Sequence, residues 1–200
     1  MLEVMEFRAS AYGPEILRIL EIGAGDHWVA GYRLMPLAPR GCAFAEARAE
    51  LKLHKAQDLF PDAFSPEGAL AGLHLYFSCL DDAHKIAQDL DTPEGSFWHG
   101  IMHRQEPDAG NAAYWFRRVG KHPIFPALRD EAHRIRFDTG RDWDPFEFIE
   151  FCEGSRVRPG SEEEHIAMHV QLFEWQLLFD YCARPDPDKA REKATGAETR

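Results

Sequence analysis

The sequence has too few basic residues to suit a nucleic-acid partner. Its 23 lysines and arginines stand against 34 aspartates and glutamates, which gives a formal net charge of -11 at pH 7. Binding to a phosphate backbone needs a basic surface, and the one local basic cluster, Arg117, Arg118 and Lys121, is small. We therefore expect no nucleic-acid partner, although a small anion could still use this cluster.

Cysteine is also scarce. The four residues are widely scattered and include no Cys-x-x-Cys pair, which excludes a zinc ribbon and a dithiol redox motif as sequence patterns. We expect reduced thiols with a mainly structural role at Cys42, Cys79, Cys152 and Cys182.

Long apolar runs and the common catalytic motifs are missing. No run approaches the roughly 18 apolar residues of a membrane span, and Glu3 and Glu6 stand where a signal peptide would need basic residues. The chain also has no Gly-x-Ser-x-Gly and no phosphate-binding glycine loop. We expect a cytoplasmic protein without a membrane partner, and the motifs leave open whether it is an enzyme.

Helical patterns dominate what is present. Several segments repeat apolar residues at helical spacing between proline and cap signals, which predicts an all-α fold of about seven or eight helices. The longest helix should begin at the capping box Ser161–Glu164 and run to about Ala183. We expect one domain over residues 1–183, with an N-terminal arm over residues 1–40 and a disordered tail over residues 184–200.

One segment imitates a nucleotide-binding motif. Residues 19–25, ILEIGAG, look like the strand and glycine turn that open methyltransferases with a nucleotide cofactor. Against this, His27 stands where a small residue is expected, and no alternation of strands and helices follows. A short helix from Pro14 to Gly23 is the preferred interpretation, and a methyltransferase is the least favoured function.

Two helical hairpins are predicted in the middle of the chain, at about residues 66–90 and 95–119. In the second, Gly100, Ala112 and Phe116 are spaced as in a degenerate tetratricopeptide repeat. We expect both hairpins to pack against the long C-terminal helix. A protein-interaction module is therefore an alternative function, with another protein as partner.

Histidine spacing in the second hairpin suggests a metal site. His99 and His103 are four residues apart on one helical face, Glu106 follows near the same face, and His84 lies on the preceding hairpin. Side-by-side packing of the two hairpins would bring these side chains together around a divalent metal such as zinc. The alternative is a set of core histidines that are hydrogen-bonded to carboxylates and to the backbone.

The same hairpin is rich in groups that bind small anions. The candidate ligand-binding residues combine imidazole, guanidinium and phenol groups, and they are His99, His103, Arg104, Tyr114, Arg117 and Arg118. Arginine offers a planar fork for bidentate contacts with carboxylate or phosphate. The leading functional hypothesis is a polar pocket for a metal or a small anionic ligand, whereas the alternative is pairing of these cations with the many acids of the chain.

The central run resembles a family of bacterial and fungal proteins of unknown function. The resemblance covers about residues 65–183 and is carried by three motifs: Trp98-His99-Gly100-Ile101-Met102-His103-Arg104, Glu106-Pro107-Asp108 and Tyr114-Trp115-Phe116-Arg117-Arg118-Val119-Gly120. Gln105 departs from the family pattern, which favours arginine. The resemblance implies common ancestry but no assigned activity.

Overall fold

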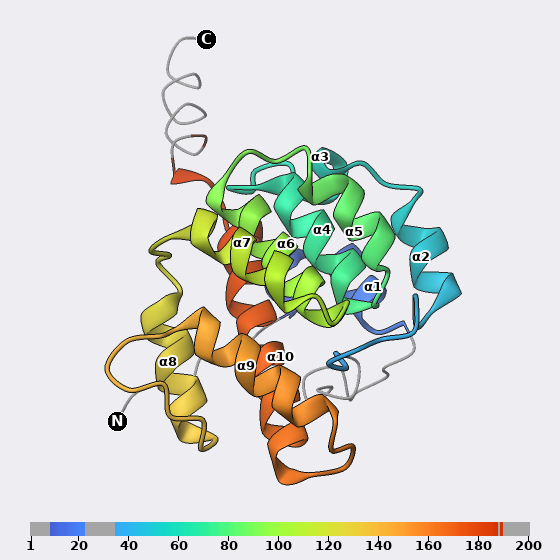
Figure 1. Ribbon diagram of the computed structural model, residues 1–200. Helices are drawn as coiled ribbons and strands as arrows, with labels where there is room; N and C mark the ends of the chain where they lie inside the picture. Colours follow the sequence, from blue (N-terminus) through green and yellow to red (C-terminus); the bar gives the residue numbers. More distant parts are fainter. Residues whose placement is uncertain (1–8, 23–34, 188, 190–200) are drawn as a thin grey trace, which may run out of the picture.

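The computed structural model describes residues 9–22, 35–187 and 189, and these residues form an all-α fold (Figure 1). Within them there is no strand, and the one β interaction is an isolated bridge between Ala63 and Pro185. The elements in chain order are η1 (Ala9–Tyr12), α1 (Pro14–Leu20), α2 (Ala45–Leu51), α3 (Ala56–Leu59), α4 (Pro66–Tyr76), α5 (Leu80–Ala87), α6 (Pro93–Gln105), α7 (Ala109–Val119), α8 (Phe125–Arg134), α9 (Pro145–Arg156) and α10 (Glu162–Ala183). Ten α-helices in the described residues exceed the seven or eight that the sequence predicts.

The extra helices come partly from a break that packing imposes. The sequence predicts one helix from Ala43 to Leu59, whereas the chain leaves helical geometry between Leu51 and Ala56. Both of these side chains are buried in the core. In a continuous helix, residues five apart would point about 140° away from each other, so the break lets both face the same interior.

The segment that imitates a methyltransferase motif begins in a helix. Ile19 and Leu20 are buried residues of α1, which confirms the helical interpretation of the stretch after Pro14. The glycine turn at Gly23 and Gly25 lies outside the described residues. With no strand in the described chain, the alternating pattern that this cofactor fold requires is missing there.

The two predicted hairpins are formed by α4 with α5 and by α6 with α7, and α10 packs on α4, α8 and α9. Figure 1 shows α10 passing behind α6 and α7, with α8 and α9 beside its other end. Caps at the expected positions set the helix starts. Asp108 accepts a hydrogen bond from the Asn111 N–H (3.0 Å), and Ser161 accepts one from the Glu164 N–H (3.1 Å).

Two glycines allow the helices to approach closely. A Cβ on Gly72 would lie 2.8 Å from the Trp98 ring, and the Gly72 carbonyl accepts a hydrogen bond from Trp175 Nε1 (2.7 Å). A Cβ on Gly100 would lie 2.7 Å from the Phe116 ring. These contacts hold α4, α6, α7 and α10 together around one core.

A buried ion pair links α6 to α10. The side chains of Arg104 and Glu174 are both fully buried, and the guanidinium donates two hydrogen bonds to the carboxylate. Arg104 also donates to Gln171 (3.4 Å) and lies over the Phe148 ring, 4.4 Å from its centroid. The carboxylate, the amide and the ring together compensate the guanidinium for its lost hydration.

The described part of the predicted N-terminal arm lies on the core. Met35 and Leu37 are buried, and Gln171 donates hydrogen bonds to the carbonyls of Met35 (2.9 Å) and Pro36 (3.2 Å). Most of the predicted tail, from residue 190 on, lies outside the described residues. Among the described helices, none combines the length and apolar character that crossing a membrane requires.

The close approach at Gly100 predicts a stability effect. Gly100→Ala should lower the free energy of unfolding by about 1–3 kcal/mol, because Phe116 must move to admit the methyl group. The matched control is Gly154→Ala in α9, where no atom lies within 4 Å of the added Cβ. That change should stabilise the helix by about 0.5–1 kcal/mol. Urea denaturation would measure both, and equal effects would contradict the close packing.

The buried ion pair between Arg104 and Glu174 predicts a second stability effect. Glu174→Ala should cost about 3–5 kcal/mol, because it leaves the Arg104 guanidinium buried without its carboxylate. The double variant Arg104→Met/Glu174→Met removes both charges and should be much more stable than the single variant. If urea denaturation found the double variant no better, the cost would lie in packing and not in the unpaired charge.

Candidate functional site

The three predicted metal-binding histidines meet at the contact between α5 and α6. The ring centroid of His84 lies 5.0 Å from that of His99 and 5.9 Å from that of His103. The His99 ring also stacks on Trp115 of α7, with centroids 4.0 Å apart. Packing of the two hairpins therefore brings together imidazoles that are distant in sequence.

His99 is held as a neutral ring with one nitrogen available. Its Nδ1 lies 3.2 Å from the Gly95 carbonyl, which can only accept, so Nδ1 carries the proton and Nε2 carries a lone pair. Nε2 is buried and has no hydrogen-bond partner among the described residues. Burial, and next the neighbouring His84, lower the pKa of His99 to about 4.

The fourth predicted ligand, Glu106, contacts only one of these histidines. Its Oε2 lies 3.0 Å from His103 Nδ1. In the described part of the chain, two groups of side chains bring three ligand atoms within 4.8 Å of one another, and the predicted set is neither of them. The histidines thus form a ring cluster, but their nitrogens do not converge on one point with Glu106.

The other candidate ligand-binding residues are spread over separate places. Arg104 is in the core with Glu174, so it does not line a pocket beside the histidines. Arg118 pairs with Asp91 (3.1 Å) on the surface, and its guanidinium lies over the Trp115 ring.

Tyr114 is half exposed on α7, with its ring edge against Trp115. Arg117 turns toward α9, where it lies 5.7 Å from the centroid of the Phe146 ring. The six candidate residues therefore do not share one anion pocket.

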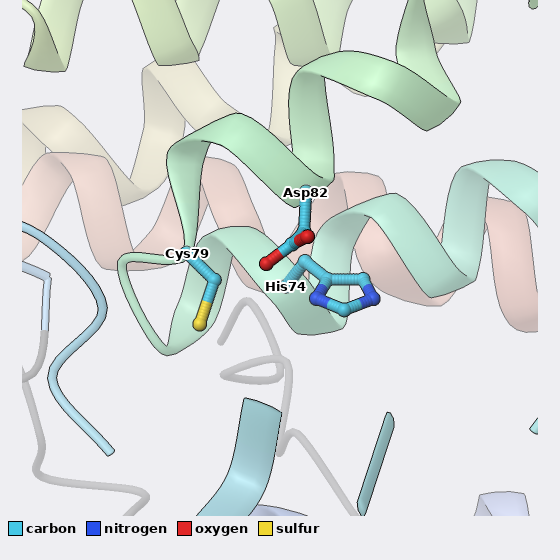
Figure 2. Close-up of side chains that lie close together, drawn as sticks. All are labelled: His74, Cys79 and Asp82. Carbon is cyan, nitrogen blue, oxygen red and sulfur yellow. The ribbon is translucent and has the colours of Figure 1, made fainter. Parts of the chain in front are cut away.

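A different group, which the sequence analysis does not single out, does bring ligand atoms together. One atom each of His74, Cys79 and Asp82 lies within 4.8 Å of the other two, and all three side chains are buried. Figure 2 shows His74 on α4, Cys79 in the turn between α4 and α5, and Asp82 in the first turn of α5. Their sequence spacings of five and three match no metal motif, and the tight turn creates the cluster.

Backbone hydrogen bonds build this turn. The Cys79 N–H donates to the His74 carbonyl (2.9 Å), and the Asp82 N–H donates to the Cys79 carbonyl (3.1 Å). Ser78, between them, has φ of 59°, a left-handed conformation that reverses the chain direction. The three side chains are therefore placed by local backbone geometry on rigid helix ends.

The group combines a neutral imidazole with an ionised carboxylate. Burial lowers the pKa of His74 to about 4, so the ring is neutral at pH 7, and its Nδ1 has no hydrogen-bond partner among the described residues. Burial raises the pKa of Asp82, but the Arg48 hydrogen bond and charge outweigh this and hold it below the ordinary value. Arg48 Nε lies 2.5 Å from one oxygen of Asp82, and Lys52 Nζ lies 3.5 Å from the other.

Cys79 is joined to Cys42 by a disulfide, so the expectation of reduced thiols is wrong for these two residues. The Ala43 N–H donates to the Phe77 carbonyl (2.9 Å), which pairs the strand-like segment before α2 with the α4–α5 turn. The two cysteines are 37 residues apart, so their sequence spacing does not predict that they lie close together. Cys152 and Cys182 are free and buried.

A small cavity lies beside Cys79 and Asp82. It has a volume of about 170 Å³ and is lined by Cys42, Cys79, Asp82, Arg48 and Glu106 among others. His74 does not line this cavity, which borders the cluster on the side of the two cysteines and Asp82. Glu106, from the predicted set, contributes a carboxylate to the rim.

The second group with three ligand atoms close together is Glu15, Glu50 and His54. It is more exposed, and Arg18 hydrogen-bonds to both carboxylates. This group is already satisfied as a surface ion-pair network, so it is the weaker candidate.

The buried neutral state of His99 predicts a pH dependence. Because its folded pKa of about 4 lies below the ordinary 6.5, the unfolded chain binds the proton more tightly. Stability should fall as pH drops from about 6.5 toward 4, by up to about 3 kcal/mol. His99→Gln keeps a donor for the Gly95 carbonyl and should flatten part of this slope in urea denaturation at pH 7 and 5. The exposed His165→Gln is the control, and equal slopes for all three proteins would contradict a neutral buried His99.

No known family model, curated protein or solved structure matches this chain. The resemblance to a bacterial and fungal family of unknown function and the likeness to tetratricopeptide repeats therefore stay predictions.

Proposed function

We propose that the reduced protein binds one zinc ion at His74, Cys79 and Asp82, with Cys42 as the fourth ligand. The observation that carries this proposal is the buried neutral ring of His74. Its Nδ1 has no hydrogen-bond partner in the described chain, and one of its ring nitrogens lies within 4.8 Å of a sulfur and of a carboxylate oxygen. A buried polar atom without a partner costs free energy, and a bound cation would remove that cost.

The donor set favours zinc. Zinc takes thiolate, imidazole and carboxylate ligands together in tetrahedral sites, whereas magnesium and calcium prefer oxygen alone. Asp82 could give the metal the oxygen that lies 3.5 Å from Lys52 Nζ, while Arg48 keeps its hydrogen bond to the other oxygen. Arg48 and Lys52 would offset the surplus negative charge of the three anionic ligands.

The disulfide makes metal binding depend on redox state. A disulfide sulfur has no thiolate charge, so Cys42 and Cys79 must first be reduced. A dithiol reductant would supply two electrons and two protons, become a disulfide itself and leave two protein thiols. Zinc would then displace both thiol protons. Cys42 and Cys79 would thus be linked by a disulfide in the oxidised protein and by the zinc ion in the reduced protein.

The test is zinc stoichiometry in the two redox states. Protein made without an affinity tag, reduced and passed through gel filtration with zinc, should carry one zinc per chain by elemental analysis, and oxidised protein should carry none. Zinc at 100 times its Kd should stabilise the reduced protein by about 2.7 kcal/mol, visible as a higher Tm. Cys42→Ser, Cys79→Ser and His74→Gln should lose stoichiometric uptake.

The control variant is Cys152→Ala, which removes a buried thiol away from the turn and should leave zinc uptake unchanged. Circular dichroism of each variant would show that the helices persist. Equal zinc uptake by the oxidised and reduced proteins would contradict the proposal, and so would full uptake by His74→Gln.

The three-histidine cluster is a second candidate metal site. The observation in its favour is the buried Nε2 of His99, which has no partner among the described residues. The ring centroid of His99 lies 5.0 Å from that of His84 and 6.1 Å from that of His103. His99→Gln and His103→Gln separate the two sites. If these variants lose zinc while His74→Gln keeps it, the metal belongs to the histidine cluster.

A further inference from the structure

A groove of about 830 Å³ lies between α7, α8 and the start of α9, on residues that the proposed metal site does not use. Its volume is within the range of about 300–1,000 Å³ that small-molecule sites have. The apolar lining is mainly aromatic, with Phe116 from α7, Phe125 from α8, Trp143 from the segment before α9 and Phe146 from the first turn of α9. This wall suits an apolar or aromatic ligand group.

Two buried side chains of the lining have polar atoms without partners. Trp143 and Thr139 are each 6% exposed, and neither Trp143 Nε1 nor Thr139 Oγ1 has a hydrogen-bond partner in the described chain. Indole N–H can only donate, whereas the hydroxyl can donate or accept. Buried polar atoms normally find partners, so these two atoms indicate a polar ligand against the aromatic wall.

The groove also carries charges of both signs that do not pair with each other. Arg117 and Lys121 come from α7 and the segment after it, and Asp142 and Glu147 come from the segment before α9 and its first turn. None of these four forms an ion pair with any described residue.

The other charged side chains of the groove already have partners. Asp144 accepts hydrogen bonds from the Phe146 and Glu147 N–H groups at the start of α9, and Arg129 pairs with Asp130. The charges available to a ligand are therefore two cations and two acids.

We propose that this groove binds a short apolar peptide through its free termini. Arg117 and Lys121 would hold the terminal carboxylate, Asp142 and Glu147 would hold the terminal ammonium, and the aromatic wall would bury the side chains. A phosphate or nucleotide fits less well, because the two acids would repel it. The peptide amide would offer Trp143 and Thr139 the hydrogen-bond partners that they lack.

The test compares one peptide with its capped forms by isothermal titration calorimetry. Leucyl-phenylalanine should bind at one site per chain, whereas its N-acetylated and C-amidated forms should each bind roughly tenfold more weakly or worse. Free phenylalanine distinguishes a single amino acid from a peptide. Oxidised protein is used throughout, so the result does not depend on zinc.

Variants connect the binding to the groove. Arg117→Gln should weaken the native peptide roughly tenfold but leave the C-amidated form unchanged, and Glu147→Gln should do the converse with the N-acetylated form. Trp143→Phe keeps an aromatic side chain, removes the N–H and should weaken all forms of the peptide alike. Arg118→Gln is the matched control, because this neighbouring arginine pairs with Asp91 outside the groove. Absence of binding, equal binding of the capped peptides, tighter binding of free phenylalanine, or an equal loss in Arg118→Gln would overturn the proposal.

Discussion

The buried contact of Arg104 with Glu174 is the interaction on which the arrangement of the other parts depends. A guanidinium without solvent needs a fixed carboxylate, so the contact sets the rotation of α6 against α10. That rotation turns His99 and His103 of α6 away from α10 and toward α5. Gln171, one turn earlier on α10, binds both Arg104 and the carbonyl of Pro36. The ion pair is thereby connected to the segment that leads to Cys42.

The proposed metal site and the proposed peptide groove use different parts of this frame. The first lies at the turn between α4 and α5, where backbone hydrogen bonds from Cys79 and Asp82 place the ligands. The second lies between α7, α8 and α9, where Asp144 caps α9 and the aromatic side chains form one wall. Each site has buried polar atoms whose partners the described chain does not supply.

Arg104 and His74 show why candidate residues chosen by type differ from those that the fold assembles. Arg104 stands among histidines in the sequence, yet on α6 it points toward α10. There its charge is paired with Glu174. His74 lies in a helix that is buried almost all round, and its spacing to Cys79 and Asp82 matches no metal motif. Its importance comes from the turn that follows it, which brings Cys79 and Asp82 back beside the ring.

Local signals were enough to locate most helices, because capping and periodicity act over a few neighbouring residues. Ser161, Asp108 and Asp144 cap the helices that follow them, and α10 ends near Ala183 as its apolar run predicts. The sequence by itself thus determined the all-α class and the two hairpins in the middle of the chain. The tertiary structure alone decided the disulfide between Cys42 and Cys79, the burial of Arg104 and the meeting of three histidines. These contacts join residues on different elements, and their distances depend on how whole helices pack, which no spacing along one segment can encode.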